Sequence, residues 1–220
     1  MKYKILSHII DENTPSYGNS GTVKITADKQ ILKGDSCNTY RISLNNHIGT
    51  HMDCPNHFDK DGCKNSDYSI DKFIFTKPCL LEIIKKKRWI EKIDIKKHRC
   101  EINGKDIILI KTGFEKYRNL KKFMFENPGI DAEVFEYLRN EFPTVRAVGI
   151  DVISISSHSD RQRGRLSHNS ALCIKPEILI IEDMKLSELF LNDRIKKILI
   201  APLFIDKIDS APVTVIAEID

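Results

Sequence analysis

The stretch HIGTHMDCPNHF, residues 47–58, carries the densest chemistry in the sequence. It contains three of the seven histidines and one aspartate, at His47, His51, Asp53 and His57. Imidazole nitrogens and carboxylate oxygens are the ligands that zinc and similar divalent ions accept. Four such side chains, all at odd-numbered positions of one short stretch, are harder to explain by packing than a lone histidine. The stretch therefore predicts a divalent metal site.

The spacing of these residues also restricts the backbone. On an extended strand, residues i and i+2 project from the same face, which places His51 beside Asp53. A straight strand would separate His47 from His51 by roughly 13 Å, at ~3.3 Å per residue, whereas ligands of one ion lie ~3–4 Å apart. We therefore expect the chain to bend between them, and Gly49 lies where bending is easiest. Gly49 and Pro55 both disfavour a helix in this stretch.

Length and composition describe a globular chain. Of its 220 residues, 41% are hydrophobic and 30% are charged, which is typical of globular proteins. This length can bury one sizeable core, and we expect a single domain over residues 1–220. No apolar run in the sequence reaches the ~20 residues of a membrane-spanning helix. Asp11 and Glu12 lie where a secretory signal would be apolar, so we expect a cytoplasmic protein without a membrane partner.

Charge and cysteine content argue against a nucleic-acid-binding protein and against a zinc ribbon. The 35 basic and 31 acidic residues give a net charge of +4, which is weak for a nucleic-acid-binding protein. The basic stretch at residues 85–99 is interrupted by Glu91 and Asp94 and is interpreted as a solvated face, with a surface for nucleic acid or an acidic partner as the alternative. The six cysteines contain no CxxC pair, which excludes a zinc ribbon and favours reduced thiols.

Strands outnumber helices in the pattern of apolar residues. One helix is expected at residues 131–141, with Asp131 as its N-cap, and a second, short one at 186–191. The strands interleave with the helices, so we predict an α/β or α+β chain, one domain with a mixed β-sheet core and few helices. The expected strands span residues 3–9, 39–44, 77–84, 106–111, 145–150, 177–181, 197–201 and 213–219.

Residues 47–58 resemble the signature of the cyclase family of metal-dependent hydrolases, which includes bacterial kynurenine formamidase and isatin hydrolase. The resemblance implies a kynurenine formamidase-like fold of the swivelling β/β/α type, and it extends along most of the chain. The matching positions are His47, Gly49, Thr50, His51, Asp53, Pro55, His57 and Phe58, with further similarity at residues 5–8, 13–17, 110–117, 149–151, 167–168 and 181–182.

The resemblance implies a set of metal ligands. In the two-metal members, the positions of His47, His51 and Asp53 hold one ion, and the aspartate bridges to a second. The positions of His168 and Glu182 hold that second ion. Zinc is the expected metal and manganese the alternative, with one or two ions per subunit.

Two further roles follow from the resemblance. The position of His57 is the proton donor and acceptor, a role that suits imidazoles in general because their unperturbed pKa is near neutral. A hydrogen bond that orients Asp53 or the water is the alternative. Tyr17 occupies the position of an aromatic residue that packs on the substrate in kynurenine formamidases.

The sequence also departs from the family pattern. The interval from residue 168 to Glu182 is longer than usual in the family, so Glu177 remains an alternative ligand. Residues 207–212 replace the family's Gly-x-Asp-Gly-Ser-Pro turn without its glycines.

These features predict a metal-dependent hydrolase of an amide bond, in an N-formyl arylamide such as N-formylkynurenine or in a cyclic amide. A non-catalytic protein that uses its metal to bind a small carboxylate or aromatic ligand is the alternative. The apolar strands at 3–9 and 213–219 would be unfavourable as free edges. We therefore expect a homodimer or homotetramer, with the segment around Tyr17 near a neighbouring subunit and the substrate pocket.

Overall fold

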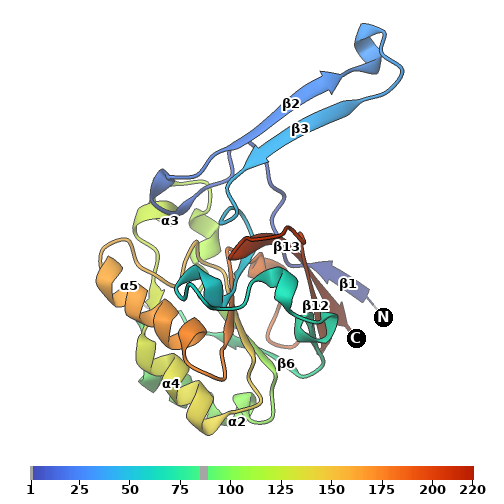
Figure 1. Cartoon of the computed structure of the whole chain (residues 1–220). Helices are drawn as coiled ribbons and strands as arrows, with labels where there is room; N and C mark the ends of the chain where they lie inside the picture. The colour runs from blue at the N-terminus through green and yellow to red at the C-terminus, as the bar shows by residue number, and fades with distance from the viewer. Residues whose placement is uncertain (1, 85–88) are drawn as a thin grey trace.

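The apolar runs of the sequence form a nine-stranded mixed sheet in the computed structural model, which describes residues 2–84 and 89–220 (Figure 1). The predicted mixed sheet is thereby confirmed. Its strand order is β5 (Ile74–Phe75), β12 (Ile195–Pro202), β13 (Ser210–Ile219), β4 (His51–Asp53), β11 (Leu179–Glu182), β10 (Ala147–Ile150), β8 (Ile107–Lys111) and β6 (Pro78–Glu82), with β1 (Lys2–Ile5) paired to β13.

One half of this sheet is parallel and buried on both faces. Strands β6, β8, β10 and β11 run parallel, and the remaining pairs are antiparallel. Strands buried on both faces have near-continuous apolar sequences, which is why these runs lack alternation. Ile108 and Ile110 of β8 belong to one buried apolar cluster. Ile107 and Leu109 point to the opposite face and belong to a second cluster.

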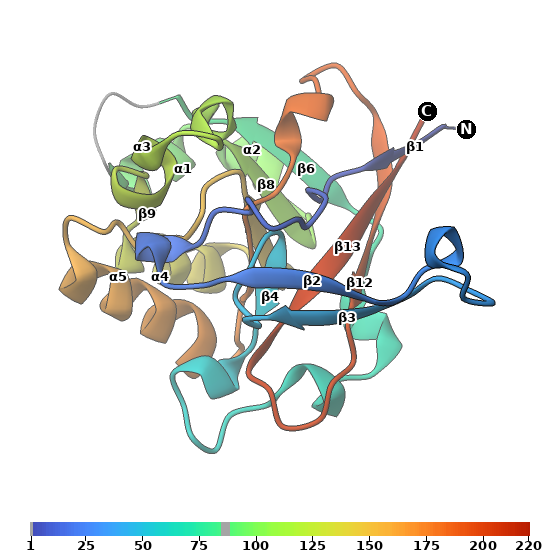
Figure 2. The same cartoon turned by 90° about the horizontal axis from the view of Figure 1, so that it is seen from above.

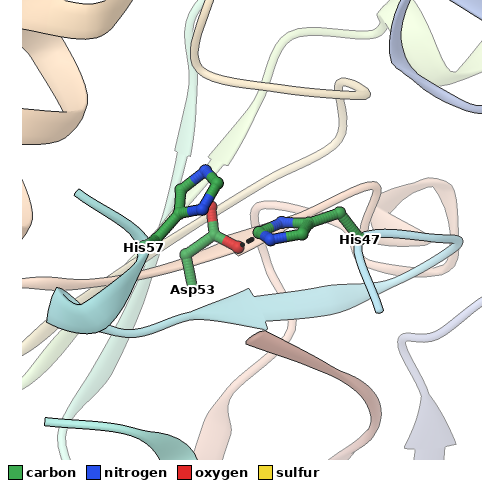
Figure 3. Close-up of side chains that lie close together, drawn as sticks. All are labelled: His47, Asp53 and His57. Carbon is green, nitrogen blue, oxygen red and sulfur yellow. Dashed lines mark ion pairs between the residues drawn. The ribbon is translucent and has the colours of Figure 1, made fainter. Parts of the chain in front are cut away.

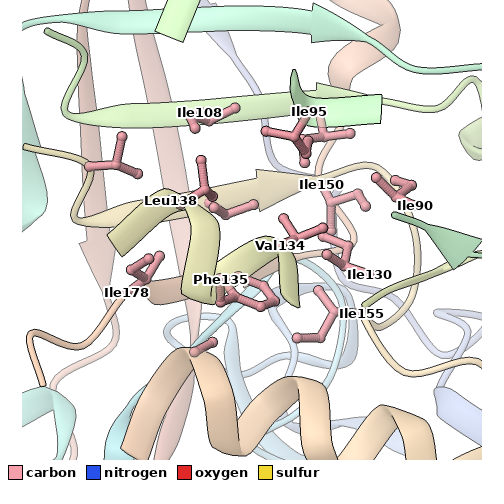
Figure 4. Close-up of a cluster of buried hydrophobic side chains, with 14 of the residues drawn as sticks. Ile90, Ile95, Ile108, Ile130, Val134, Phe135, Leu138, Ile150, Ile155 and Ile178 are labelled. Atoms are coloured by element: carbon pink, nitrogen blue, oxygen red, sulfur yellow. The ribbon is translucent and has the colours of Figure 1, made fainter. Parts of the chain in front are cut away.

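Helices cover one face of the parallel half. The predicted helix with Asp131 as its N-cap is α4 (Ala132–Glu141), and the Asp131 side chain accepts a hydrogen bond from the Glu133 backbone N–H. Its residues Val134, Phe135 and Leu138 are fully buried against the sheet (Figure 4). Within the described ranges, no helix is long and apolar enough to cross a bilayer. The helices are α1 (Lys92–Lys96), α2 (Arg99–Ile102), α3 (Lys121–Phe125), α4 (Ala132–Glu141) and α5 (Arg161–His168).

The prediction of a short helix at residues 186–191 is wrong. Only Leu186–Glu188 forms a single 3₁₀ turn, and Leu189 is extended. Leu186 and Leu189 are both fully buried in the second apolar cluster. Six residues are too few to offset the cost of starting a helix, so burial of the two leucines decides the local backbone.

Helix α5 was not expected, because its sequence RQRGRLSH has no apolar stripe. Asp160 caps it by accepting a hydrogen bond from the Arg163 backbone N–H at 3.0 Å. Gly164 allows the helix to lie against Ser156, whose Oγ would be 2.2 Å from a Cβ at that position. A cap and a close approach therefore replace amphipathicity, and they bring His168 at the helix end toward the sheet.

Strands β2 (Val23–Lys29) and β3 (Thr39–Leu44) form a separate antiparallel ribbon that projects from the body of the molecule (Figures 1 and 2). Leu32 at its tip is fully exposed, and Tyr40 and Ile42 are more than half exposed. This ribbon, residues 23–44, is called the arm below. A smaller parallel ribbon pairs β7 (Trp89–Ile90) with β9 (Gly129–Ile130).

The two terminal strands pair with each other. Strand β1 lies antiparallel to β13, with Ile5 opposite Ile216. Strand β13 also pairs with β12 and β4, so the run at 213–219 is covered within the chain and needs no neighbouring subunit to cover it. Tyr3 and Ile5 of β1 remain more than 60% exposed. The apolar character of β13 is explained by its central place in the sheet rather than by a partner chain.

The basic stretch at residues 85–99 is only partly described, because residues 85–88 lie outside the described residues. The remainder enters α1 and α2. Lys96 and Lys97 are exposed on this segment, whereas Ile95 is fully buried in the first apolar cluster.

Candidate metal centre and active site

The candidate site lies where the parallel and antiparallel halves of the sheet meet. Strand β4 contributes His51 and Asp53, and the neighbouring strand β11 places Glu182 opposite His51. His168 is the last residue of α5, and His47 lies in the loop before β4. The topology thus gathers segments that are distant in the sequence at the centre of the sheet.

The predicted bend at Gly49 is present. Gly49 has φ +61°, a left-handed conformation that glycine adopts without strain. A Cβ there would also lie only 3.0 Å from Ile10 Cγ1. The bend carries the His47 ring back over the strand, so that His47 Nδ1 lies 3.0 Å from Asp53 Oδ1 (Figure 3).

Two histidines from different elements lie on either side of the buried carboxylates. His51 Nε2 is 3.7 Å from Asp53 Oδ1 and 3.4 Å from Glu182 Oε2. His168 Nε2 is 3.7 Å from Asp53 Oδ2 and 3.3 Å from Glu182 Oε1. All four side chains are at most 5% exposed. Among the described residues, two groups have ligand atoms within 4.8 Å of one another: His51, Asp53 and Glu182, and His47, Asp53 and His57.

The donor set of this cluster fits a metal ion. Neither oxygen of Asp53 accepts a hydrogen bond of normal geometry from the described residues, although the carboxylate is buried. A buried carboxylate of this kind is costly in a protein interior unless a cation lies beside it. His51 Nδ1 donates to the Gly49 carbonyl at 2.8 Å, and His168 Nδ1 donates to the Gly164 carbonyl at 3.0 Å. Because Nδ1 carries the proton in both rings, each Nε2 is left to bind a cation beside Asp53.

The electrostatics of the cluster also favour a cation. Burial disfavours charged histidines, but Asp53 and its carboxylate neighbours outweigh it and raise the pKa of His47 and of His168 to about 10. Burial opposes ionisation of Glu182 too, yet the adjacent imidazoles lower its pKa to about 2. Positive charge is therefore stabilised here, and a divalent ion would compete with protons for the same nitrogens.

The structure brings Glu182, and not Glu177, to the cluster. Glu182 Oε1 accepts hydrogen bonds from Ser154 Oγ at 3.1 Å and from the Ile155 backbone N–H at 2.7 Å, which fixes its carboxylate. Glu177 instead pairs with Lys72, whose Nζ lies 3.0 Å from Glu177 Oε1.

A pocket of about 340 Å³ opens over the cluster. Tyr17 forms one wall, and its buried hydroxyl has no hydrogen-bond partner among residues 2–84 and 89–220. Phe58 stacks on the His168 ring, with centroids 5.0 Å apart and an interplanar angle of 24°. The lining therefore combines the polar cluster with aromatic surface. Other lining residues include Asn46, His57, Ile153 and Ser154.

His57 lies beside the cluster with one ring nitrogen already occupied. Its Nδ1 is 2.7 Å from Asp209 Oδ2, and the same oxygen is 2.8 Å from His47 Nε2. Sequence reasoning gave Asp209 no role. The available signal was the turn at residues 207–212, in which the aspartate of the family pattern is retained while the glycines are not.

Comparisons with known proteins agree with this architecture. Residues 5–157 match the profile of the Cyclase family, described as "Putative cyclase". An uncharacterized protein of Haemophilus influenzae is 34% identical over 108 residues, which cover 48% of this chain and 76% of that protein. Kynurenine formamidase of Bacillus cytotoxicus is 26% identical over 182 residues, covering 82% and 80% of the two chains.

Solved structures share the whole fold. A protein described as a potential metal-dependent hydrolase with cyclase activity superposes with a TM-score of 0.77 at 24% identity, covering 98% of this chain and 96% of the other. Isatin hydrolase A from Labrenzia aggregata gives a TM-score of 0.81 at 18% identity, covering 98% and 93%. The cyclase-type fold expected from the sequence is confirmed, and this chain belongs to the cyclase family.

Proposed function

We propose that this chain is a metal-dependent hydrolase of amide bonds. The observation that carries the proposal is the buried carboxylate of Asp53, which accepts no normal hydrogen bond from the described residues and faces imidazoles at the floor of an open pocket. The similarity to a kynurenine formamidase over most of the chain, and to isatin hydrolase in fold, supports the reaction class.

The proposed ligands divide into two sets that share Asp53. His47, His51 and Asp53 would hold one ion, and Asp53, His168 and Glu182 a second, with zinc the expected metal and manganese the alternative. Divalent ions held there would lower the pKa of a bound water toward neutrality and polarise a substrate carbonyl. The side chains are fixed beforehand by the hydrogen bonds to Gly49, Gly164, Ser154 and Ile155 described above.

His57 is proposed to move the proton that amide hydrolysis requires. A carboxylate can only accept hydrogen bonds, so His57 donates from Nδ1 to Asp209 and keeps a lone pair at Nε2. The ring lines the pocket beside Asp53. From there Nε2 can take a proton from water and deliver it to the leaving amine.

The proposed substrate is a small aromatic amide, either an N-formyl arylamide such as N-formylkynurenine or a cyclic amide such as isatin. A pocket of about 340 Å³ has the size of a small-molecule site. Tyr17 and Phe58 supply the aromatic walls, on which an aryl ring would pack. Replacing Tyr17 by Ala is expected to raise KM more than it lowers kcat.

We also propose that the chain assembles as a homodimer or homotetramer. The arm is the supporting feature, because an isolated two-stranded ribbon is marginally stable in water and this one exposes Leu32, Tyr40 and Ile42. Sedimentation equilibrium is expected to give at least twice the 25.3 kDa mass of one chain. The mass of a single chain at micromolar concentration would contradict the assembly.

The reaction is tested by a substrate screen with defined metal content. Protein from which a chelator has removed the metal is assayed against N-formylkynurenine, formanilide and isatin, before and after addition of Zn²⁺ or Mn²⁺. Hydrolysis of at least one amide that appears only with metal is the expected result. Tight binding of these compounds by the fully metal-loaded protein without turnover would instead support the non-catalytic alternative.

A further inference from the structure

The carboxylate of Asp209 joins the two parts of the site, the metal ligands and the proton carrier. We propose that Asp209 is a positioning residue that sets which nitrogen of His47 faces the metal and which nitrogen of His57 faces the substrate. This inference rests on the proposed function for the roles of the two histidines. Its geometry stands on the structure alone.

One oxygen of Asp209 serves both rings. Asp209 Oδ2 lies 2.8 Å from His47 Nε2 and 2.7 Å from His57 Nδ1. The two imidazoles are neighbours, with centroids 4.2 Å apart and an interplanar angle of 39°. Different nitrogens are used in the two rings, so the opposite atoms, His47 Nδ1 and His57 Nε2, are the ones left for chemistry.

Asp209 is itself held in place from two sides. Its second oxygen, Oδ1, accepts a hydrogen bond from Asn46 Nδ2 at 2.7 Å. Its backbone carbonyl accepts a hydrogen bond from the Cys54 backbone N–H at 3.0 Å, directly after Asp53. The following residue, Ser210, is paired with Asp53 in the sheet. The position of the Asp209 carboxylate is therefore tied to the strand that carries the proposed ligands.

A carboxylate fixes the tautomer of a neutral histidine because it accepts protons in hydrogen bonds and offers none. When a metal ion takes the place of the Nδ1 proton, His47 must keep its remaining proton on Nε2, and its Nδ1 lone pair, 3.0 Å from Asp53 Oδ1, binds the ion. His57 must carry its proton on Nδ1, which leaves the Nε2 lone pair to accept a proton. One acidic side chain thus prepares both a metal ligand and a base.

The other two histidines of the cluster do not depend on a side chain in this way. His51 and His168 donate from Nδ1 to the main-chain carbonyls of Gly49 and Gly164. Those acceptors cannot be removed by substitution, whereas the acceptor of His47 and His57 can. Substituting Asp209 therefore tests what orients the rings of His47 and His57.

The first experiment measures zinc affinity of the Asp209→Asn variant by competition with a chromophoric chelator. Asparagine keeps the shape, but its oxygen is needed as the acceptor for Asn46 Nδ2, which turns the amide N–H₂ toward His47 and His57. We expect affinity to fall about 10–100-fold, the usual effect of removing a partner of a metal-bound histidine. The matched control is Asp206→Asn in the same loop, where the carboxylate is 80% exposed and pairs with Lys207, and its zinc affinity is expected to equal that of the wild type.

The second experiment reads the His57 tautomer by long-range ¹H–¹⁵N NMR of histidine-labelled, zinc-loaded protein. The wild type and Asp206→Asn are expected to show His57 protonated on Nδ1. Asp209→Asn is expected to shift it toward the Nε2-protonated form. Neither readout uses a substrate, so a failed activity screen and a failed role for Asp209 are distinguishable.

Two outcomes would overturn the inference: zinc affinity of folded Asp209→Asn within twofold of the wild type, or a His57 tautomer that is unchanged by the substitution. If Asp209→Asn does not fold, Asn46→Ala takes its place. That variant removes the hydrogen bond to Oδ1 and lets the carboxylate rotate, so zinc affinity should fall in the same direction by a few-fold. An unchanged affinity in Asn46→Ala would then count against the role of Asp209.

Discussion

Two buried aspartates, one in the central sheet and one just after it, have opposite surroundings. Asp151 follows β10 and is 1% exposed, and its carboxylate accepts hydrogen bonds from the Thr112 N–H at 2.8 Å, the Thr112 hydroxyl at 2.6 Å and the Gly113 N–H at 2.8 Å. Asp53 is also 1% exposed, but within the described part of the chain it accepts no hydrogen bond of normal geometry. Three imidazoles face it instead.

The difference separates a structural carboxylate from a binding one. Burial raises the pKa of Asp151 to about 6, and the neutral donors of Thr112 and Gly113 offset only part of that cost. Burial acts on Asp53 too, yet His47 and the other histidines hold the pKa of this carboxyl well below its usual range. Asp151 is satisfied by fixed neutral donors, whereas Asp53 requires a cation beside it.

The comparison is tested most strongly at Glu182, the second carboxylate of the cluster. Glu182→Gln removes a negative charge that faces His51 and His168, so we expect metal affinity to fall by at least about 100-fold, beyond the effect of losing an indirect partner, and hydrolysis to disappear. Glu177→Gln is the matched control, because Glu177 pairs with Lys72 away from the cluster. Isothermal titration with Zn²⁺ should show the loss in the first variant and full affinity in the second. Equal affinities in both variants would remove Glu182 from the site.

His57 sharpens the comparison because it lies beside Asp53 and can be read as a ligand or as a proton carrier. We expect His57→Ala to retain zinc and to lose about 10²–10⁴-fold in kcat, the usual contribution of a positioned acid or base. Metal content and kcat are measured on the same preparation. Loss of zinc together with activity would make His57 a ligand, and an unchanged kcat would leave it no part in the reaction.

Asp151 tests the structural side of the comparison. In Asp151→Asn the amide N–H₂ must face at least one of the donors from Thr112 and Gly113. We expect the free energy of unfolding to fall by about 1–3 kcal/mol, the cost of a buried donor without an acceptor. Zinc affinity, measured on the folded variant, should stay at the wild-type value. A loss of zinc binding comparable to that of Glu182→Gln would erase the distinction between the two carboxylates.

The smallest expected effect concerns acid stability at Glu177. Burial alone would raise its pKa, but hydrogen bonds from Lys72 and Lys175 lower it to about 2. A glutamate in the unfolded chain titrates near ~4.3, so the pair stabilises the fold above that pH, and the contribution is lost as the pH falls toward 2. In urea titrations of metal-free protein, the stability difference between the wild type and Glu177→Gln should shrink from pH 6 to pH 3. A difference that stays constant would show that the ion pair adds nothing.

Much of the fold could be predicted because its strands are marked locally. The parallel strands are continuous apolar runs, and α4 has both a cap and an apolar face. Helix α5 could not be predicted, because its position depends on the contact of Gly164 with Ser156. Gly164 and Ser156 meet only because the whole fold brings their segments together, and no local sequence pattern predicts that contact.

The candidate site divides in the same way. The bend at Gly49 and the pairing of His51 with Asp53 follow from spacing within one short stretch. His168 and Glu182 entered through family resemblance, because nothing in their own sequence surroundings marks them. Asp209 was missed, since its meaning depends on a loop that returns from β12 to lie beside His47 and His57.

The most direct test is the zinc content of purified, folded Asp53→Ala, measured by inductively coupled plasma mass spectrometry after dialysis against Zn²⁺ and then buffer. Wild type and Asp151→Asn are treated in parallel. We predict at least one zinc ion per chain in both of these and none in Asp53→Ala with a native circular dichroism spectrum. Full zinc content in folded Asp53→Ala, or none in the wild type, would contradict the assignment of this cluster as the metal centre.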